Sequence, residues 1–167
     1  IGCETGLRFS DFSRIDKDDI RDGNIHFRPK KTTGRKNNKV IIPISQRLNS
    51  VLEKHGGQPP HFDINRVSLF NKILREVCQK AGLDDDIVFY RKVAGRQIKE
   101  VRKRYSQISS HTCRRTFCTL KFLKGMPAQA IMKFSGHKTE RNFLKYLKLD
   151  AEMTALKFKE IFDHAFQ

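Results

Sequence analysis

The first third of the chain alternates apolar and polar residues in two runs, 24–30 and 38–44. An Asp-Gly pair precedes the first run and a Thr-Gly pair lies between the two, and both pairs are typical of turns. A period of two, interrupted by turn residues, predicts antiparallel strands. We therefore expect a three-stranded meander over roughly residues 15–44.

The period then changes to three and four residues, which predicts helices. One helix is expected to begin at a cap residue, Asn65, to end at Gly82 and to turn its apolar face into the core. Two basic, β-tending runs around an Ala-Gly pair predict a hairpin between Ile87 and Tyr105. Further helices are predicted over residues 45–57, 110–124, 128–134, 140–149 and about 151–166.

The helix predicted over residues 110–124 carries an apolar stripe. Cys113, Phe117, Leu120 and Leu123 follow helical spacing, and Ser109 or Ser110 can cap the N-terminus. The polar residues His111 and Arg114 are expected to lie off this buried stripe. Together the elements predict an α+β fold, mainly α, with a small three-stranded sheet, a further hairpin and several packed helices in one domain, residues 1–167.

Composition indicates the class of partner. Lys plus Arg number 34 against 18 Asp plus Glu, which gives a formal net charge of +16. A field of this sign favours a polyanion, and nucleic acid is the leading candidate because phosphate neutralisation dominates such affinities. No apolar run of about 18 residues is present, so we expect no membrane partner. No signal peptide is visible, and a reducing cytoplasm is the expected location.

The sequence gives little reason to expect a metal. The four cysteines lack paired C-x-x-C spacing, and helical geometry does not aim His111, Cys113 and Cys118 at one point. The acidic run at residues 84–86 resembles a ligand cluster, but adjacent carboxylates in a loop are more often solvated. We therefore expect neither a metal nor a cofactor.

The stretch HTCRRTF, residues 111–117, places imidazole and guanidinium groups close together. On a helix, His111, Arg114 and Arg115 can converge on a single anion because residues three and four apart share a face. The alternative interpretation is a solvated basic helix face that happens to include a histidine.

Four further signals accompany this stretch: TGLRFSD at 5–11, KKT at 30–32, SGHK at 135–138 and Tyr146, nine residues after His137. In this order the motifs resemble those of the tyrosine recombinases, the integrases of phages and transposons. The chain is most similar to integrases of conjugative elements from Bacteroides-type bacteria, from residue 1 to about residue 150. The resemblance implies a tyrosine-recombinase catalytic domain that cuts and rejoins DNA through a covalent 3′-phosphotyrosyl intermediate, without a metal.

The resemblance also implies roles for particular residues. Arg8 and Arg114 would hold the scissile phosphate, His111 and His137 would assist around it, and Tyr146 would attack. Asp11 would be structural support for Arg8. Either histidine could act as the base toward Tyr146.

A lysine before the hairpin turn would protonate the leaving oxygen, and the Lys-Thr pair favours Lys31. The remaining basic residues would contact the DNA backbone; these are Lys30, Arg35, Lys36, Lys39, Arg115 and Lys138. Lys30, Lys36 and Lys39 also remain alternatives to Lys31 as the acid.

The resemblance further implies double-stranded DNA as the partner, an oligomer of up to four protomers on DNA, and a bacterial cytoplasmic location. The chain is expected to be a fragment that follows an N-terminal core-binding domain, and its last helix, 151–167, is expected to pack on its own domain or on a neighbouring protomer. A relaxing topoisomerase would use the same chemistry. A non-catalytic basic nucleic-acid-binding module is the alternative of a different class, and a metal-dependent nuclease is the third.

Overall fold

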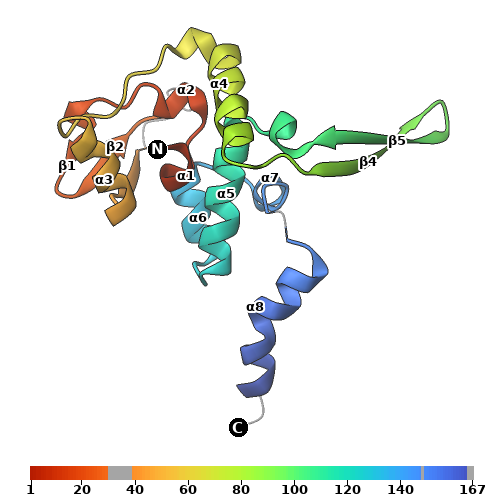
Figure 1. Ribbon diagram of the computed structural model, residues 1–167. Coiled ribbons are helices and arrows are strands. Elements are labelled where there is room, and N and C mark those ends of the chain that lie inside the picture. Colours follow the sequence, from red (N-terminus) through yellow and green to blue (C-terminus); the bar gives the residue numbers. More distant parts are fainter. Residues whose placement is uncertain (30–38, 148, 165–167) are drawn as a thin grey trace.

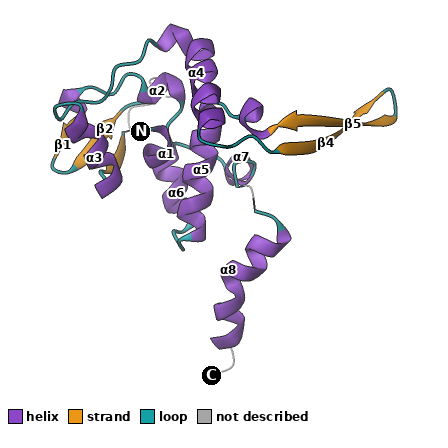
Figure 2. Ribbon diagram, in the orientation of Figure 1, coloured by secondary structure: helices purple, strands orange, loops and turns teal. Residues whose placement is uncertain are grey.

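The computed structural model describes residues 1–29, 39–147 and 149–164. Helices form the centre of the molecule, a small sheet lies on one side, a two-stranded hairpin projects from the other, and the last helix extends away from the body (Figures 1 and 2). In chain order the elements are α1 (Gly2–Thr5), α2 (Phe9–Phe12), β1 (Ile20–Arg21), β2 (Asn24–Phe27), β3 (Val40–Pro43), α3 (Gln46–Lys54), α4 (Val67–Lys80), β4 (Asp86–Val93), β5 (Arg96–Lys103), α5 (Ser110–Leu123), α6 (Ala128–Ser135), α7 (Glu140–Leu144) and α8 (Ala151–His164), with 3-10 turns at Lys17–Asp19, Ile64–Arg66 and Arg104–Gln107.

The predicted meander and hairpin are both confirmed. Strands β1, β2 and β3 form an antiparallel sheet in that order, and β4 pairs with β5. In the sheet, Ile25 lies opposite Ile42 and Phe27 opposite Val40, so the buried positions of β2 and β3 share one face. This alternation is the physical basis of the period-two pattern in the sequence.

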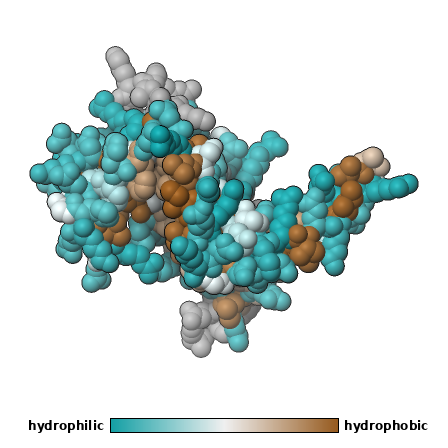
Figure 3. Space-filling model, turned by 45° about the horizontal axis from the view of Figure 1, so that its top comes forward, coloured by the Kyte–Doolittle hydropathy of each residue, from teal (hydrophilic) through white to brown (hydrophobic). Residues whose placement is uncertain are grey.

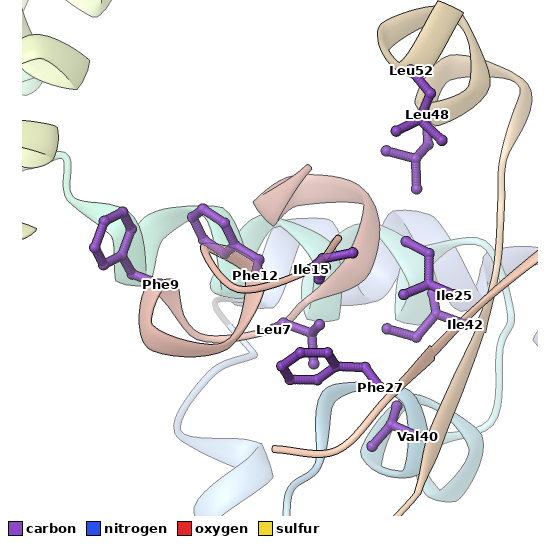
Figure 4. Packing of buried hydrophobic residues seen from close by; sticks show 10 residues of the cluster. All are labelled: Leu7, Phe9, Phe12, Ile15, Ile25, Phe27, Val40, Ile42, Leu48 and Leu52. Atoms are coloured by element: carbon purple, nitrogen blue, oxygen red, sulfur yellow. The ribbon is translucent and has the colours of Figure 1, made fainter. Parts of the chain in front are cut away.

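The first hydrophobic core lies between α1, α2, the sheet and α3. Figure 4 shows its ten side chains, which come from the segment 7–15 around α2, from strands β2 and β3, and from α3. The residues are Leu7, Phe9, Phe12, Ile15, Ile25, Phe27, Val40, Ile42, Leu48 and Leu52. Full burial of one such side chain contributes roughly 1.5–3 kcal/mol, so this cluster fixes the segment that carries Arg8 and Asp11.

The second core lies between α5, α6 and α7 and contains Phe117, Cys118, Ile131 and Phe143. The helix boundaries around it agree with the predicted caps. The Thr112 hydroxyl accepts a hydrogen bond from the Ser109 N–H at 3.0 Å at the start of α5, and the Thr139 hydroxyl caps α7. Helix α7 ends at Leu144, earlier than predicted, so Tyr146 lies in a turn rather than within a helix.

Gly6 joins the two cores. Its φ of 66° lies in the left-handed region, where glycine is favoured, and a Cβ at this position would overlap the Phe117 ring. The C-terminal end of α1 therefore packs directly against α5. The Gly6 carbonyl oxygen accepts a hydrogen bond from the Arg114 side chain.

The prediction for α4 is wrong in two respects. Asn65 does not cap this helix, because Asp63 caps the preceding 3-10 turn and α4 begins at Val67. Its apolar face is also only partly in the core: Phe70 packs against the first core, whereas Ile73 and Val77 are about half exposed, 50% and 56%. Helical spacing shows that a face is apolar but does not show what covers it.

Within the described residues, no helix is both long and apolar enough to cross a bilayer.

Candidate active site

Arg8 stands at the start of α2, where the chain is extended just before the first helical turn. Its guanidinium lies 4.0 Å from the carboxylate of Asp11, which is 2% exposed. Arg14 contacts the other oxygen of the same carboxylate at 3.3 Å. A buried carboxylate between two arginines orients both, and it leaves the Arg8 side chain partly exposed at 29%.

Arg114 is buried, at 1% exposure, so the prediction that it lies off the buried stripe of α5 is wrong. Its NH1 group donates to the carbonyl oxygens of Gly6, at 2.8 Å, and of Ser135. The Nε and NH2 groups have no hydrogen-bond partner in the described part of the chain. Burial, and next the positive charge of Arg8, lower the pKa of Arg114 to about 10.

This arrangement suits an anion. The guanidinium remains charged at neutral pH, and two of its donors are buried without an acceptor, which is costly unless a ligand supplies one. A planar fork of N–H donors matches the oxygens of a phosphate. The positive charge of Arg8 contributes to the lowered pKa of Arg114, so each cation lies within the electrostatic field of the other.

The contact between His137 and Ser135 favours one tautomer of the ring. The Ser135 hydroxyl donates to the Ile131 carbonyl at 2.6 Å, which leaves its oxygen as an acceptor for a proton on Nδ1 of His137, 2.8 Å away. The other ring nitrogen, Nε2, is buried and has no partner among the described residues. Burial, then Arg114 and Arg8, lower the pKa of His137 to about 3, so the neutral ring presents a free acceptor at Nε2.

Tyr146 packs beside these groups. Its ring centroid lies 4.6 Å from that of His137, and Cζ of Arg114 lies 5.2 Å from the Tyr146 centroid. The turn after α7 holds the residue, with the Tyr146 N–H donating to Phe143 at 2.8 Å. Residues far apart in sequence, in α5, just after α6 and in the turn after α7, therefore meet at one point.

The other predicted residues divide into two groups. His111 is exposed in the first turn of α5, three residues before Arg114, and Lys39, Arg115 and Lys138 are exposed as well. Four predicted residues lie outside the described part of the chain, between β2 and β3: Lys30, Lys31, Arg35 and Lys36.

The metal alternatives receive no support from the described residues. No three His, Cys, Asp or Glu side chains among them gather closely enough to hold an ion. In the acidic run, Asp85 pairs with Arg104 at 2.5 Å and Asp86 with Lys103 at 3.1 Å. These carboxylates therefore stabilise the base of the hairpin.

Sequence reasoning missed Ser135. The signal was present, because Ser and His flank Gly136, whose left-handed conformation ends α6. A reversal at that glycine brings the two flanking side chains together, and the short S-G-H run could have predicted the contact.

The chain is similar to known proteins both in its family pattern and in its fold. The phage integrase family model matches residues 1–153. Among solved structures, XerA recombinase is similar with a TM-score of 0.64 and 16% identity, over 95% of this chain and 54% of that one. The Tn1549 transposon integrase in complex with transposon right end DNA is similar with a TM-score of 0.54 and 13% identity, over 96% of this chain and 56% of that one. A comparison with curated proteins gave no match.

The chain thus spans just over half the length of these two structures, and at such low identity the likeness concerns the fold. The family model, in contrast, covers nearly the whole chain. The chain therefore belongs to the phage integrase family and has the tyrosine-recombinase catalytic fold.

Proposed function

We propose that this chain is the catalytic part of a site-specific DNA recombinase that cuts and rejoins DNA through a 3′-phosphotyrosyl intermediate, without a metal. The observation that carries the proposal is the buried Arg114 guanidinium, whose Nε and NH2 lack partners in the described chain, beside Tyr146 and His137. The sequences of the motifs resemble those of integrases from Bacteroides-type elements, so we propose that the protein belongs to a bacterial mobile element.

Arg8 and Arg114 hold the scissile phosphate. A phosphodiester carries one negative charge and gains a second as a nucleophile adds, so fixed guanidinium donors stabilise the transition state more than the ground state. The two arginine side chains thus provide the charge stabilisation that a metal ion provides in many nucleases.

Tyr146 is the nucleophile. Its phenol oxygen forms a bond to phosphorus while the bond from phosphorus to the 5′ oxygen breaks. A free phenol has a pKa near 10, so only about 0.1% is ionised at neutral pH and a proton acceptor is needed. Nε2 of His137 is a suitable acceptor, because the ring lies against Tyr146 and this nitrogen carries no proton.

Phosphate binding makes His137 a better base. Burial first, and then the charges of Arg114 and Arg8, lower the pKa of His137, and an anion bound by the arginines offsets their part of this shift. Substrate therefore raises the proton affinity of His137 at the step where it is required. His111, in the first turn of α5, is proposed to assist at the phosphate.

Lys31 is proposed to protonate the leaving 5′ oxygen, with Lys30, Lys36 and Lys39 as the alternatives. In the reverse direction a 5′ hydroxyl attacks the phosphotyrosine and the same groups exchange protons in the opposite sense. The phosphodiester bond energy is retained in the intermediate, so religation requires no nucleotide cofactor.

A trapping experiment tests the proposal. The protein is incubated with nicked suicide duplexes whose central segment is randomised, in the presence of a chelator, and covalent adducts are separated under denaturing conditions. We expect a DNA adduct that resists chelator and carries the 3′ end of the cut strand. DNA binding without an adduct would favour the non-catalytic module, and an adduct lost on chelation would favour metal chemistry.

A further inference from the structure

The β4–β5 hairpin is an arm that stands clear of the body. Figure 1 shows both strands projecting beyond the helices, and Figure 3 shows hydrophilic and hydrophobic side chains side by side along it. Side chains on both faces are exposed, with only Ile87 and Glu100 partly covered. At about 3.3 Å per residue, eight-residue strands reach roughly 26 Å.

The base of the arm is held firmly to the catalytic region. The Arg104 guanidinium binds the Asp85 carboxylate, with Nε at 2.7 Å from Oδ1, and the Tyr105 N–H donates to Leu83 at 3.0 Å. Five residues later the Ser110 N–H, at the start of α5, donates to the Asn71 side chain at 2.8 Å. The arm and the helix that carries Arg114 therefore share one anchored junction.

Charge is distributed unevenly along the arm. About halfway along the arm, Glu100 binds both Arg91, at 2.7 Å, and Arg102, at 2.5 Å. Toward the tip, Lys92, Arg96 and Lys99 form no ion pair with any carboxylate of the described residues. Residues 90–99 contain four basic residues and no acidic one. The outer half of the arm thus carries three positively charged side chains, Lys92, Arg96 and Lys99, that no carboxylate of the described residues neutralises.

The strands themselves explain the shape of the arm. The Ala94-Gly95 turn has positive φ at both residues, 48° and 80°, as in the primed turns that match the right-handed twist of a hairpin. Val88 lies directly opposite Val101, a cross-strand pair that stabilises the ribbon without a core. A two-stranded ribbon alone is marginally stable in water, so a surface that binds it would order it further.

We propose that the tip of this hairpin binds duplex DNA beside the cleavage point, as a second contact independent of the phosphate site. A two-stranded ribbon fits the major groove of B-DNA, where basic side chains reach phosphates and apolar ones contact thymine methyl groups. At about 3.4 Å per base pair, the arm reaches roughly seven to eight base pairs from its base. A second copy of the chain is disfavoured as occupant, because its net charge of +16 repels the tip.

This inference rests on the proposed function only in taking duplex DNA as the partner. The test compares three proteins: the parent, a tip variant with Lys92→Gln, Arg96→Gln and Lys99→Gln, and a control with the same charge change at exposed lysines elsewhere, Lys17→Gln, Lys54→Gln and Lys124→Gln. Affinity for a random-sequence duplex is measured against salt concentration by fluorescence anisotropy.

Each phosphate contact contributes about 0.9 to the slope of log affinity against log salt. We expect the slope of the tip variant to be smaller in magnitude by about two to three, with little change in the control. A tip variant with the slope of the parent, or a parent that binds no duplex, would overturn the inference. Covalent adduct formation, which tests the proposed function, is a separate measurement.

A cross-linking readout separates DNA from a protein occupant. A benzophenone amino acid is placed at Gln97, near the tip, and as a control at Gln79, exposed on α4. The inference predicts photo-cross-links to DNA from position 97 and far fewer from position 79. Cross-links from position 97 to another protein chain, with none to DNA, would contradict it.

Discussion

At the scale of single residues, the candidate site depends on which hydrogen-bonding groups are already satisfied. Arg114 uses one nitrogen to bind the carbonyls of Gly6 and Ser135, and it keeps two others for a ligand. One side chain therefore joins the two cores and forms part of an anion site. Its structural and chemical roles can be separated by substitution.

The substitution Arg114→Lys keeps the positive charge but removes the planar fork of guanidinium N–H donors. We expect stability to fall by roughly 1.5–3 kcal/mol, the typical contribution of a hydrogen bond to a charged group, and adduct formation to fall more than DNA binding. Urea unfolding and the trapping assay measure these effects. In the exposed neighbour, Arg115→Lys should change stability by no more than about 0.5 kcal/mol. Equal adduct yields in parent and Arg114→Lys would contradict the assigned role.

Ser135 provides a second test at this scale. In Ser135→Ala the Nδ1–H of His137 loses its acceptor, so the population with a proton on Nε2 should increase. Two-bond proton–nitrogen spectra of the imidazole report the tautomer directly, and the pH profile of adduct formation should shift in parallel. Ser13→Ala, at another buried serine, should leave both unchanged. An unaltered His137 tautomer in Ser135→Ala would show that the serine does not position the ring.

At the scale of elements, the sequence predicted those helices and strands whose burial follows their own period. The burial of β2 and β3 alternates as predicted, and α5 and α7 begin at the predicted caps. The β4–β5 hairpin forms where it was predicted, although neither of its faces is buried. Helix α4 differs because its apolar side chains line an open groove of about 440 Å³ with Phe9 and Phe62. A single sequence shows that such a face is apolar, whereas the residues that cover it are determined by tertiary packing.

Helix α8 also has an apolar face whose covering could not be predicted from the sequence. Phe158 packs against Phe122 at a centroid distance of 6.2 Å, whereas Leu156 and Phe162 are 79% and 75% exposed. We predict that these two side chains bind a neighbouring protomer on DNA. Leu156→Ser with Phe162→Ser should leave monomer stability unchanged and reduce the mass of DNA-bound complexes in sedimentation. Phe158→Ser should instead lower monomer stability. Unchanged complexes in the double variant would contradict the docking prediction.

At the scale of the whole molecule, charge determines the kind of DNA binding that we predict. The net charge of +16 favours contacts with the phosphate backbone, which carry little sequence preference. With six to ten phosphate contacts, affinity should fall roughly 10³–10⁵-fold between about 50 and 200 mM salt. Anisotropy with two unrelated duplexes should give similar affinities. Tight, sequence-selective binding at the higher salt concentration would contradict this prediction.

Part of the candidate site could be predicted from the order of the motifs. This order grouped Arg114, His137 and Tyr146, whose side chains lie against one another in the structure, whereas their catalytic roles stay predictions. The burial of Arg114 and the contact between Ser135 and His137 were not predicted, because both arise from the packing of α1 and α6 against α5. Periodicity within one segment carries no information about such contacts between segments.

The central claim is that Tyr146 is the nucleophile, and trapping on nicked suicide duplexes tests it most directly. Tyr146→Phe removes one oxygen from a half-buried side chain, so the protein should fold and bind DNA normally while the covalent adduct disappears. The two other tyrosines serve as matched controls, and Tyr90→Phe and Tyr105→Phe should retain the adduct. Mass spectrometry should locate the DNA on the peptide that contains Tyr146. An adduct that persists in Tyr146→Phe, or one that maps to a serine or to another tyrosine, would contradict the proposed mechanism.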